Sequence, residues 1–150
     1  MHSLIPIIIV KLGIIKFLII YFGSLIAGSI LTQVYHKNEL YYSAVGASGA
    51  VAGVIYGSIL LNPNMSLMMF PLPIPIPGYI FGIGYLLYSI YGMKKRVGNI
   101  GHSAHLGGAI GGFVFTLLLF PQVLRENLLM IIFLSLPILV LLVFGKKLNV

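Results

Sequence analysis

Long apolar runs that contain no charged side chain constrain this sequence more than any other feature. The longest is Phe17 to Tyr35, a run of 19 residues between Lys16 and His36. A helix of that length, rising about 1.5 Å per residue, crosses a hydrocarbon core of roughly 30 Å. The chain as a whole is 59% hydrophobic and 7% charged, which leaves too little polar surface to cover a soluble domain. We therefore predict an all-α integral membrane protein.

Further apolar runs predict about five transmembrane helices in one polytopic bundle. After the first run, the predicted spans are Tyr42–Leu61, Gly78–Met93, Gly101–Phe120 and Leu128–Phe144. Residues 1–16 begin with an apolar stretch that is too short to cross a bilayer. We expect them to form an N-terminal lead-in or remnant, and residues 17–145 to form the transmembrane domain. Within residues 62–77, alternating prolines exclude a helix and predict a loop along the membrane surface.

The sequence is basic, with nine Lys and Arg against two acidic residues and a formal net charge of +7. These cations stand singly or in short clusters beside apolar runs, as in Lys94-Lys95-Arg96. The pattern indicates contact with anionic lipid head groups and argues against nucleic acid as a partner, because no basic face with stacking aromatics is present. There is no cysteine, so disulfides and thiolate-bound metals are excluded. No cofactor is expected.

Two of the predicted helices carry stripes of small residues. Gly49 and Gly53 lie four residues apart on one helix, and Gly108 and Gly112 lie four apart on another. Membrane helices pack through such stripes because small side chains let the backbones approach each other. Packing alone would explain the glycines by themselves. If the stripes face each other, the two helix axes lie closer than the usual separation of about 8–10 Å.

A polar side chain on each striped helix suggests chemistry. Ser48 lies about six residues into the span predicted from Tyr42, and His105 lies four residues into the span predicted from Gly101. One span intervenes, so the two helices run in the same direction and the side chains lie at similar depth. A serine beside a histidine pairs a nucleophile with a general base, and we expect a separation of about 2.6–3.2 Å, or somewhat longer without substrate. Alone, Ser48 could be structural and bond its own helix, whereas a histidine inside a membrane usually marks a functional site.

The other titratable residues argue against a catalytic triad and against a metal site. Glu39 precedes the serine helix and Glu126 follows the histidine helix, so no acid completes a triad and a Ser–His dyad is expected. His102 and His105 are three residues apart and could share a metal ion. No carboxylate or cysteine stands near enough in sequence to complete such a site, so no metal is expected.

Several motifs resemble those of a known family. Residues 46–50, Gly-Ala-Ser-Gly-Ala, resemble the GxSG motif of rhomboid proteases, and residues 104–109, Ala-His-Leu-Gly-Gly-Ala, resemble their catalytic histidine helix. Residues 85–92, followed by Asn-Ile-Gly-His at 99–102, look like the bacterial branch of that family. Residues 11–122 can be laid along the family's third to sixth helices in order. The chain is therefore identified as a rhomboid-like helix bundle of the bacterial type.

The resemblance implies an intramembrane serine endopeptidase that hydrolyses peptide bonds in or near transmembrane segments of other proteins. Ser48 would attack the scissile carbonyl, with His105 as its general base. The backbone N–H groups of Ser48 and Ala47 would contribute to an oxyanion hole, and Gly46 belongs to the serine motif. The remaining expected site residues, which would line the mouth of the site or a lateral gate, are His102, Asn99, Phe81 and Tyr85.

The sequence departs from the family pattern in three respects. The family's second helix carries a His and an Asn, four residues apart, that complete the oxyanion hole, and residues 1–10 contain no such pair. The chain is therefore expected to be N-terminally incomplete, without the family's first two helices. Ala52 stands where the family usually has an aromatic residue packed on the histidine, and Tyr56 is the nearest aromatic on that face. Finally, more cations flank the active-site side than the opposite side, whereas the family opens its site outward.

The resemblance also implies a multi-pass protein of the bacterial inner membrane, with transmembrane proteins as substrates and lipid as its surroundings. The alternative is a non-catalytic rhomboid-like protein that binds transmembrane segments without cleaving them. Retention of Ser48 and His105 favours the enzyme, whereas the missing oxyanion pair favours the binding protein. The sequence carries no signal for a particular oligomeric state.

A first prediction concerns the activity of these 150 residues alone. We expect weak or undetectable proteolysis, because loss of one oxyanion-hole donor typically costs about 10²–10³ in rate. A fluorophosphonate probe reports the nucleophilicity of Ser48 without a substrate. It should label this chain slowly and a version extended by two N-terminal helices quickly, with Ser48→Ala as the control in both. Strong Ser48-dependent labelling and cleavage by the short chain would contradict the prediction.

Overall fold

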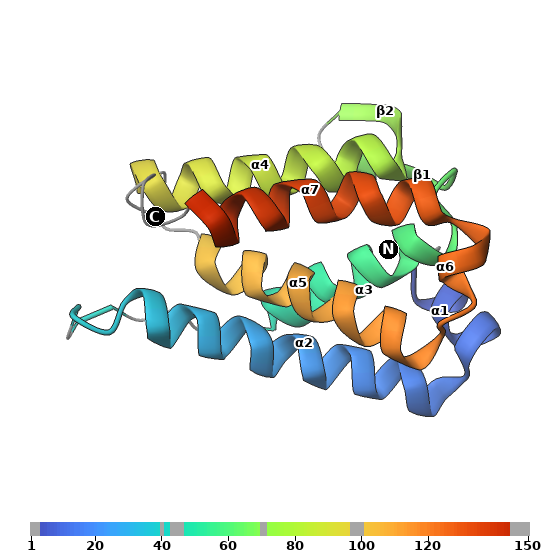
Figure 1. Cartoon of the computed structure of the whole chain (residues 1–150), viewed down its shortest axis with the longest axis horizontal. Helices are drawn as coiled ribbons and strands as arrows, with labels where there is room; N and C mark the ends of the chain where they lie inside the picture. Colours follow the sequence, from blue (N-terminus) through green and yellow to red (C-terminus); the bar gives the residue numbers. More distant parts are fainter. Residues whose placement is uncertain (1–3, 40, 43–46, 70–71, 97–100, 145–150) are drawn as a thin grey trace.

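Helices that lie side by side make up most of the structure (Figure 1). The computed structural model describes residues 4–39, 41–42, 47–69, 72–96 and 101–144. Its elements in chain order are α1 (Leu4–Leu12), α2 (Ile14–Tyr35), α3 (Ser48–Leu61), β1 (Ser66–Met69), β2 (Leu72–Pro77), α4 (Gly78–Lys95), α5 (His102–Leu119), α6 (Val123–Glu126) and α7 (Leu128–Phe144). α3 and α5 start at the same end of the bundle, and α4 runs in the opposite direction (Figure 1).

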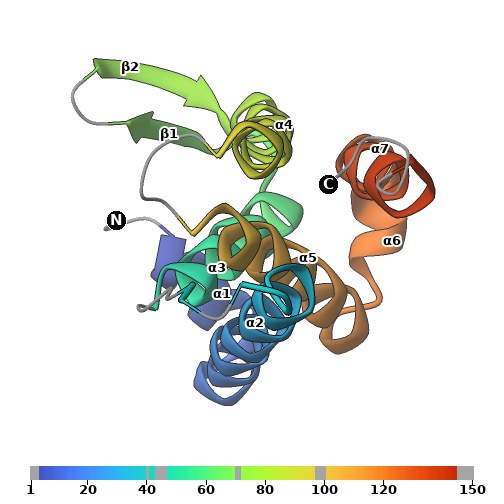
Figure 2. The same ribbon diagram turned by 90° about the vertical axis from the view of Figure 1, so that its left-hand side faces the viewer.

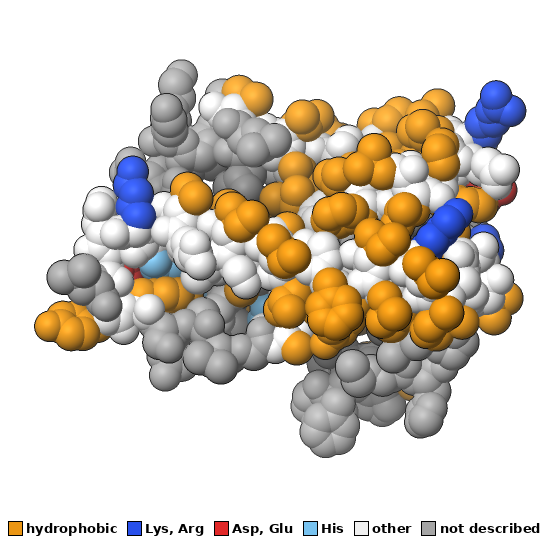
Figure 3. All heavy atoms as spheres, turned by 90° about the horizontal axis from the view of Figure 1, so that it is seen from below, with side chains coloured by type: hydrophobic (Ala, Val, Ile, Leu, Met, Phe, Trp, Pro, Cys, Tyr) orange, Lys and Arg blue, Asp and Glu red, His pale blue; other side chains and the backbone are white. Residues whose placement is uncertain are grey.

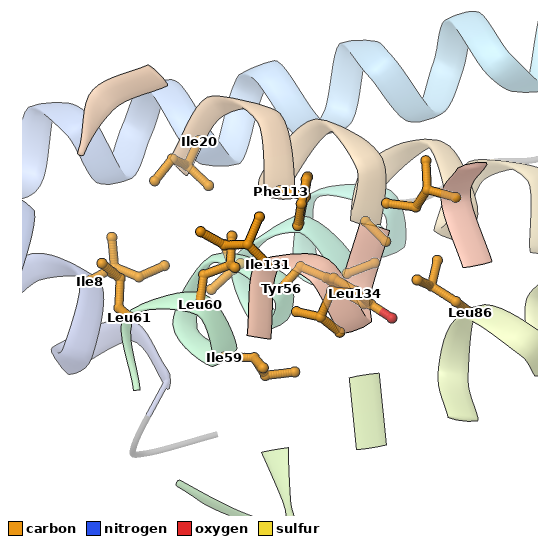
Figure 4. Packing of buried hydrophobic residues seen from close by; sticks show 14 of the residues in the cluster. Ile8, Ile20, Tyr56, Ile59, Leu60, Leu61, Leu86, Phe113, Ile131 and Leu134 are labelled. Atoms are coloured by element: carbon orange, nitrogen blue, oxygen red, sulfur yellow. The ribbon is translucent and has the colours of Figure 1, made fainter. Parts of the chain in front are cut away.

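The helices α2, α3 and α5 pack most closely and form the centre of the bundle. Seen end-on, α4 lies on the side of α3 and α5 away from α2, and α7 packs against α4 (Figure 2). One buried apolar cluster draws side chains from all of these helices and from α1 (Figure 4). α3 and α5 therefore both pack into a core that they share with the other helices.

The outer surface of the bundle is apolar. α2 and α5 are long and apolar enough to cross a membrane, and α3 and residues Leu128–Val140 of α7 form shorter apolar helices. α2 exposes a stripe of large apolar side chains, namely Ile15, Ile19, Phe22, Ile26, Ile30 and Val34. Figure 3 shows apolar side chains across the middle of one face, with Lys and Arg at its ends. An apolar surface of this extent suits lipid, and the predicted helical membrane bundle is confirmed.

The predicted helix boundaries agree well for α4, α5 and α7 and disagree for α3. The span predicted from Tyr42 begins at Ser48, with Ala47 as its N-cap (φ −78°, ψ 13°). Apolar residues ahead of the serine extended the prediction too far. The predicted depth of Ser48, six residues into the helix, was therefore wrong, because it is the first residue of α3.

The prediction of a plain loop over residues 62–77 was also wrong, because this stretch contains an antiparallel hairpin of β1 and β2. The Gly78 N–H donates a hydrogen bond to the Met65 carbonyl at 2.8 Å, and hydrogen-bonded pairs recur at every second residue of such a ladder. Pro75 and Pro77 occupy the alternate positions of β2, where backbone nitrogens point away from the partner strand. The prolines exclude a helix, as predicted, but cost this ladder no hydrogen bond.

The apolar N-terminal stretch forms α1, which packs against α3 and α2. Ile8 is fully buried in the shared cluster (Figure 4). The Lys11 ammonium donates a hydrogen bond to the Leu61 carbonyl at the end of α3 (2.6 Å), and the Lys16 ammonium donates one to the Leu119 carbonyl at the end of α5 (3.1 Å). Cations at these positions also complement the negative ends of the helix dipoles. The N-terminal residues thus hold the C-terminal ends of α3 and α5 together.

The packing of α1 can be tested at its buried face. Ile8→Ala should destabilise the bundle by about 2 kcal/mol, the low end of the usual cost for emptying a buried aliphatic site, because lipid is itself apolar. Val10→Ala, on the same helix and 83% exposed, is the matched control and should change stability by less than about 0.5 kcal/mol. Thermal unfolding in detergent measures both variants. Equal, small effects would show that α1 does not pack on the bundle.

Candidate active site

The backbones of α3 and α5 touch along two pairs of glycines. A Cβ atom added to Gly108 would collide with the backbone of Gly49, and one added to Gly112 would collide with the backbone of Gly53. A Cβ atom added to Gly49 would lie 2.9 Å from the carbonyl oxygen of Ala104. Only residues without a side chain permit such an approach, so the two glycine stripes face each other.

α2 is a third partner in this contact, and we did not predict it from the sequence. A Cβ atom added to Gly28 would lie 2.6 Å from the Ala104 carbonyl oxygen, and one added to Gly107 would lie 2.8 Å from the α2 backbone. Ser24 is fully buried against Gly53. Small residues four apart, such as Ser24 and Gly28, are the signal that could have revealed this packing face. α2 thus fixes α3 and α5 from one side.

Ser48 is exposed and opens α3. The N–H groups in the first turn of a helix have no acceptor within the helix. Here the first bond of the helix is donated by the Val51 N–H to the Ala47 carbonyl, at 3.1 Å. The N–H groups of Ser48, Gly49 and Ala50 precede it and have no acceptor within the helix. Such an array at the positive end of a helix dipole suits a negatively charged oxygen. The Ser48 N–H expected in the oxyanion hole is part of it.

His105 lies in the first turn of α5 and is half-buried. Its N–H donates a hydrogen bond to the Gly101 carbonyl at 3.0 Å. His105 follows Ala104, whose carbonyl touches Gly49, and Gly49 follows Ser48. Each candidate residue is therefore one residue away from the same backbone contact. Among the described residues no hydrogen bond joins the Ser48 hydroxyl to the His105 ring, and such bonds are often long before substrate binds.

The aromatic side chain that packs on the His105 ring is Tyr85 of α4. The two rings are stacked, with centroids 5.9 Å apart and planes inclined by 25°. Phe81, one turn earlier on α4, also stacks on Tyr85, with centroids 5.7 Å apart and planes inclined by 17°. Tyr56 is fully buried, and its ring centroid lies 6.4 Å from that of Tyr85. Its hydroxyl donates a hydrogen bond to the Gly82 carbonyl. The sequence pointed to Tyr56 as the nearest aromatic, because spacing along one helix cannot reveal a partner on another.

The expected gate residues Phe81 and Tyr85 also line an apolar groove of about 500 Å³ beside α4. Its other lining residues are Ile76, Ile80, Gly84 and Tyr88. Ile76 belongs to β2, so the hairpin forms one side of this groove. A groove with almost no polar lining suits an aliphatic or aromatic side chain rather than a charged ligand.

His102, expected at the mouth of the site, lines a cavity of about 150 Å³ together with Ser103, at the end of the bundle where α5 begins. His102 is only 4% exposed. Its ring packs against Gly92 and lies edge-on to Tyr88, with centroids 5.2 Å apart. The Ser103 hydroxyl shares a hydrogen bond with the hydroxyl of Thr32 at 3.1 Å. These two residues therefore tie α5 to α4 and α2 beside the candidate site.

The acidic side chain near this end of the bundle, Glu39, already has two partners. Glu39 pairs with Arg96 at 2.8 Å and with His36 at 3.2 Å. The described part of the chain holds no cluster of three or more His, Cys, Asp or Glu side chains that could bind a metal ion. Two expected site residues, Gly46 and Asn99, lie outside the described residues.

Comparison with known proteins identifies the fold that carries this arrangement. The Rhomboid domain model matches residues 3–122. The chain belongs to the rhomboid family. It is 30% identical over 107 residues to Rhomboid protein 1, mitochondrial, of Saccharomyces cerevisiae, and 35% identical over 98 residues to Rhomboid protease GluP of Bacillus subtilis. No solved structure matches it significantly.

These alignments cover only part of each rhomboid relative. They include 69% and 65% of this chain, but 31% of the yeast protein and 17% of the Bacillus protein. One relative is mitochondrial by name and the other comes from a bacterium, so the family is shown and the bacterial type remains a prediction. Family membership and the apolar helices together indicate an integral membrane protein of the rhomboid family.

The glycine contact yields a stability prediction. Gly53→Leu or Gly108→Leu should push α3 and α5 apart and cost at least about 1–3 kcal/mol, as overpacking usually does. Gly84→Leu on α4 is the matched control, since nothing lies within 4 Å of a Cβ atom added there. Thermal unfolding in detergent provides the measurement for all three variants. If all three variants behave like the parent, α3 and α5 do not meet at these glycines.

Proposed function

We propose that this rhomboid chain carries the catalytic serine and histidine of an intramembrane serine endopeptidase, which cleaves peptide bonds in or near transmembrane segments. The observation that carries the proposal is the direct contact of α3 and α5 at Gly49 and Ala104. Ser48 and His105 each stand one residue from it. The contact brings a hydroxyl and an imidazole to the same end of the bundle, and one relative, GluP, is a protease by name.

The bond changes and proton transfers of the proposed reaction involve the two side chains, the substrate and water. The Ser48 Oγ would attack the scissile carbonyl carbon while His105 takes its proton, giving a tetrahedral intermediate. His105 would then donate that proton to the leaving nitrogen as the C–N bond breaks, leaving an acyl ester on Ser48. Water would attack this ester with His105 again as the base, which releases the carboxylic acid and restores the serine. Ser48 is exposed in a first helical turn, so substrate can reach its hydroxyl.

The charge that develops on the substrate oxygen would be stabilised at the start of α3. The N–H groups of Ser48 and Ala47 are the proposed donors, and each oxyanion-hole donor is typically worth about 10²–10³ in rate. The positive end of the α3 dipole acts in the same direction. Gly49 leaves room for the α5 backbone beside this turn, so the donors and the base approach the substrate from adjacent helices.

The proposed substrates are transmembrane segments of other proteins, which would reach Ser48 from the surrounding lipid. We further propose a multi-pass location in a bacterial inner membrane. The support is the 35% identity to the Bacillus relative and the bacterial-type sequence pattern of residues 85–102. Lipid would contact the apolar stripe of α2, and the cations at the ends of the bundle would lie among the head groups.

A non-catalytic rhomboid-like protein that binds transmembrane segments is the second candidate. It is favoured by one observation, the absence of a hydrogen bond between Ser48 and His105 among the described residues. In that case the apolar groove beside α4 would hold a partner segment, and the two polar residues would only contribute to packing. The two candidates differ in whether the Ser48 hydroxyl reacts.

Fluorophosphonate labelling over long incubations in lipid nanodiscs separates these candidates. Ser48→Ala should abolish labelling because the probe bonds to Oγ. His105→Ala should slow it by on the order of 10³-fold or more, since the hydroxyl loses its base. Ser29→Ala is the matched control and should label like the parent, because the Ser29 hydroxyl is exposed and bonds only the Leu25 carbonyl of its own helix.

The opposite outcome is equally clear. If the parent labels no faster than Ser48→Ala, both as this chain and as a version extended at its N-terminus, the catalytic proposal fails and the binding protein is favoured. Circular dichroism of each variant should match the parent, which separates a chemical effect from misfolding.

A further inference from the structure

The His105 ring needs a partner that fixes its orientation. In serine–histidine catalysis a third group normally orients the base, and no acidic residue stands nearby in the sequence. None of the described residues donates or accepts a hydrogen bond at the His105 ring. The contact that the structure does give the ring is the stack on Tyr85. Among the described contacts, stacking on Tyr85 is therefore the one that can orient the His105 ring.

The geometry of this stack is well suited to hold a ring. The centroid separation of 5.9 Å lies in the range of about 4.5–7 Å that is favourable for aromatic pairs. Phe81 stacks on Tyr85 in turn, with planes only 17° apart. The Tyr85 ring is thus held by a neighbour on its own helix, and His105 completes a row of three rings.

The position of Tyr85 is fixed through α4. Tyr56 donates a hydrogen bond from α3 to the Gly82 carbonyl, one turn before Tyr85. A Cβ atom added to Gly82 would lie 2.9 Å from Leu134 of α7, so the helix is closely packed there. Leu86, the next residue after Tyr85, is fully buried. These contacts place the tyrosine ring relative to α3, which carries the serine.

On α3 itself, no aromatic ring lies between Ser48 and Tyr56, where a ring could stack on His105. Ala52 lies one turn from Ser48 and one turn from Tyr56, so all three share one face of the helix. Ala52 is 1% exposed, and its methyl group is all that α3 presents between the serine and the tyrosine. We propose that Tyr85 is the positioning residue for His105, holding the imidazole where it can take the Ser48 proton. This inference rests on the proposed function and adds to it the residue that orients the base.

Labelling kinetics test the positioning role. Tyr85→Leu should slow the maximal rate of fluorophosphonate labelling roughly 10- to 100-fold, because a misplacement of about 1 Å can cost on the order of 10² in rate. The probe concentration for half-maximal rate should stay the same. Tyr85→Phe keeps the ring and should stay within about threefold of the parent, since the stack does not use the hydroxyl. Tyr91→Leu, on the same helix and 56% exposed, is the matched control and should label like the parent.

A second-site variant tests whether the lost ring can be replaced from α3. The double variant Tyr85→Leu with Ala52→Phe introduces a ring on the α3 face that carries Ser48 and Tyr56. Recovery of much of the labelling rate is expected. Recovery of thermal stability without recovery of the labelling rate would show that Tyr85 has a merely structural role.

A spectroscopic measurement tests the stack without catalysis. In protein labelled with ¹³C-histidine, the His105 ring protons should be shifted upfield by the Tyr85 ring, and His105→Gln assigns the signal. Tyr85→Leu should remove the shift and Tyr85→Phe should keep it. If the shift is absent from the parent, or if Tyr85→Leu removes it without slowing labelling, the positioning role is overturned. If the parent shows no Ser48-dependent labelling but keeps the shift, the proposed function fails and the stack is a packing contact only.

Discussion

Close approach of the α3 and α5 backbones is the constraint on which the rest of the structure depends. In lipid, apolar side chains gain little by leaving their surroundings, so helices associate mainly through contact at short range. Gly49, Gly53, Gly108 and Gly112 supply that contact by presenting no side chain, and α2 closes it from one side. A methyl group at Gly49 or Gly108 would separate the two helix starts, and the serine and histidine with them.

The two ends of α3 and α5 are used differently. Every helix leaves unpaired carbonyls at its C-terminal end and unpaired N–H groups at its N-terminal end. Here Lys11 and Lys16 bind carbonyls at the C-terminal ends, which closes that side of the bundle. The N-terminal end of α3 keeps its N–H groups ahead of the first intrahelical bond, next to Ser48. Carbonyls at one end of the pair are thus bound within the chain, and the N–H groups at the other end are those that we propose for the oxyanion hole.

Features that repeat along one helix could be predicted from the sequence, whereas contacts between helices could not. Apolar runs located α4, α5 and α7, and glycine spacing located the faces that meet. The start of α3 at Ser48 was missed because apolar residues continue ahead of it, and the hairpin was missed because alternating prolines were interpreted only as helix breakers. The stack of Tyr85 on His105 joins residues of two helices at positions that no spacing rule connects.

The ring that stacks on His105 comes from α4 and not from the serine helix α3. α3 and α5 are joined by backbone contacts, whereas α4 packs less closely on both of them and also bears against α7. A ring on α3 would move with the serine as one rigid unit. The proposed orientation of His105 by Tyr85 instead depends on a helix that packs less closely on the serine helix. Because Tyr85 and Phe81 also line the apolar groove, whatever fills that groove would contact the ring that we propose as the support of the base.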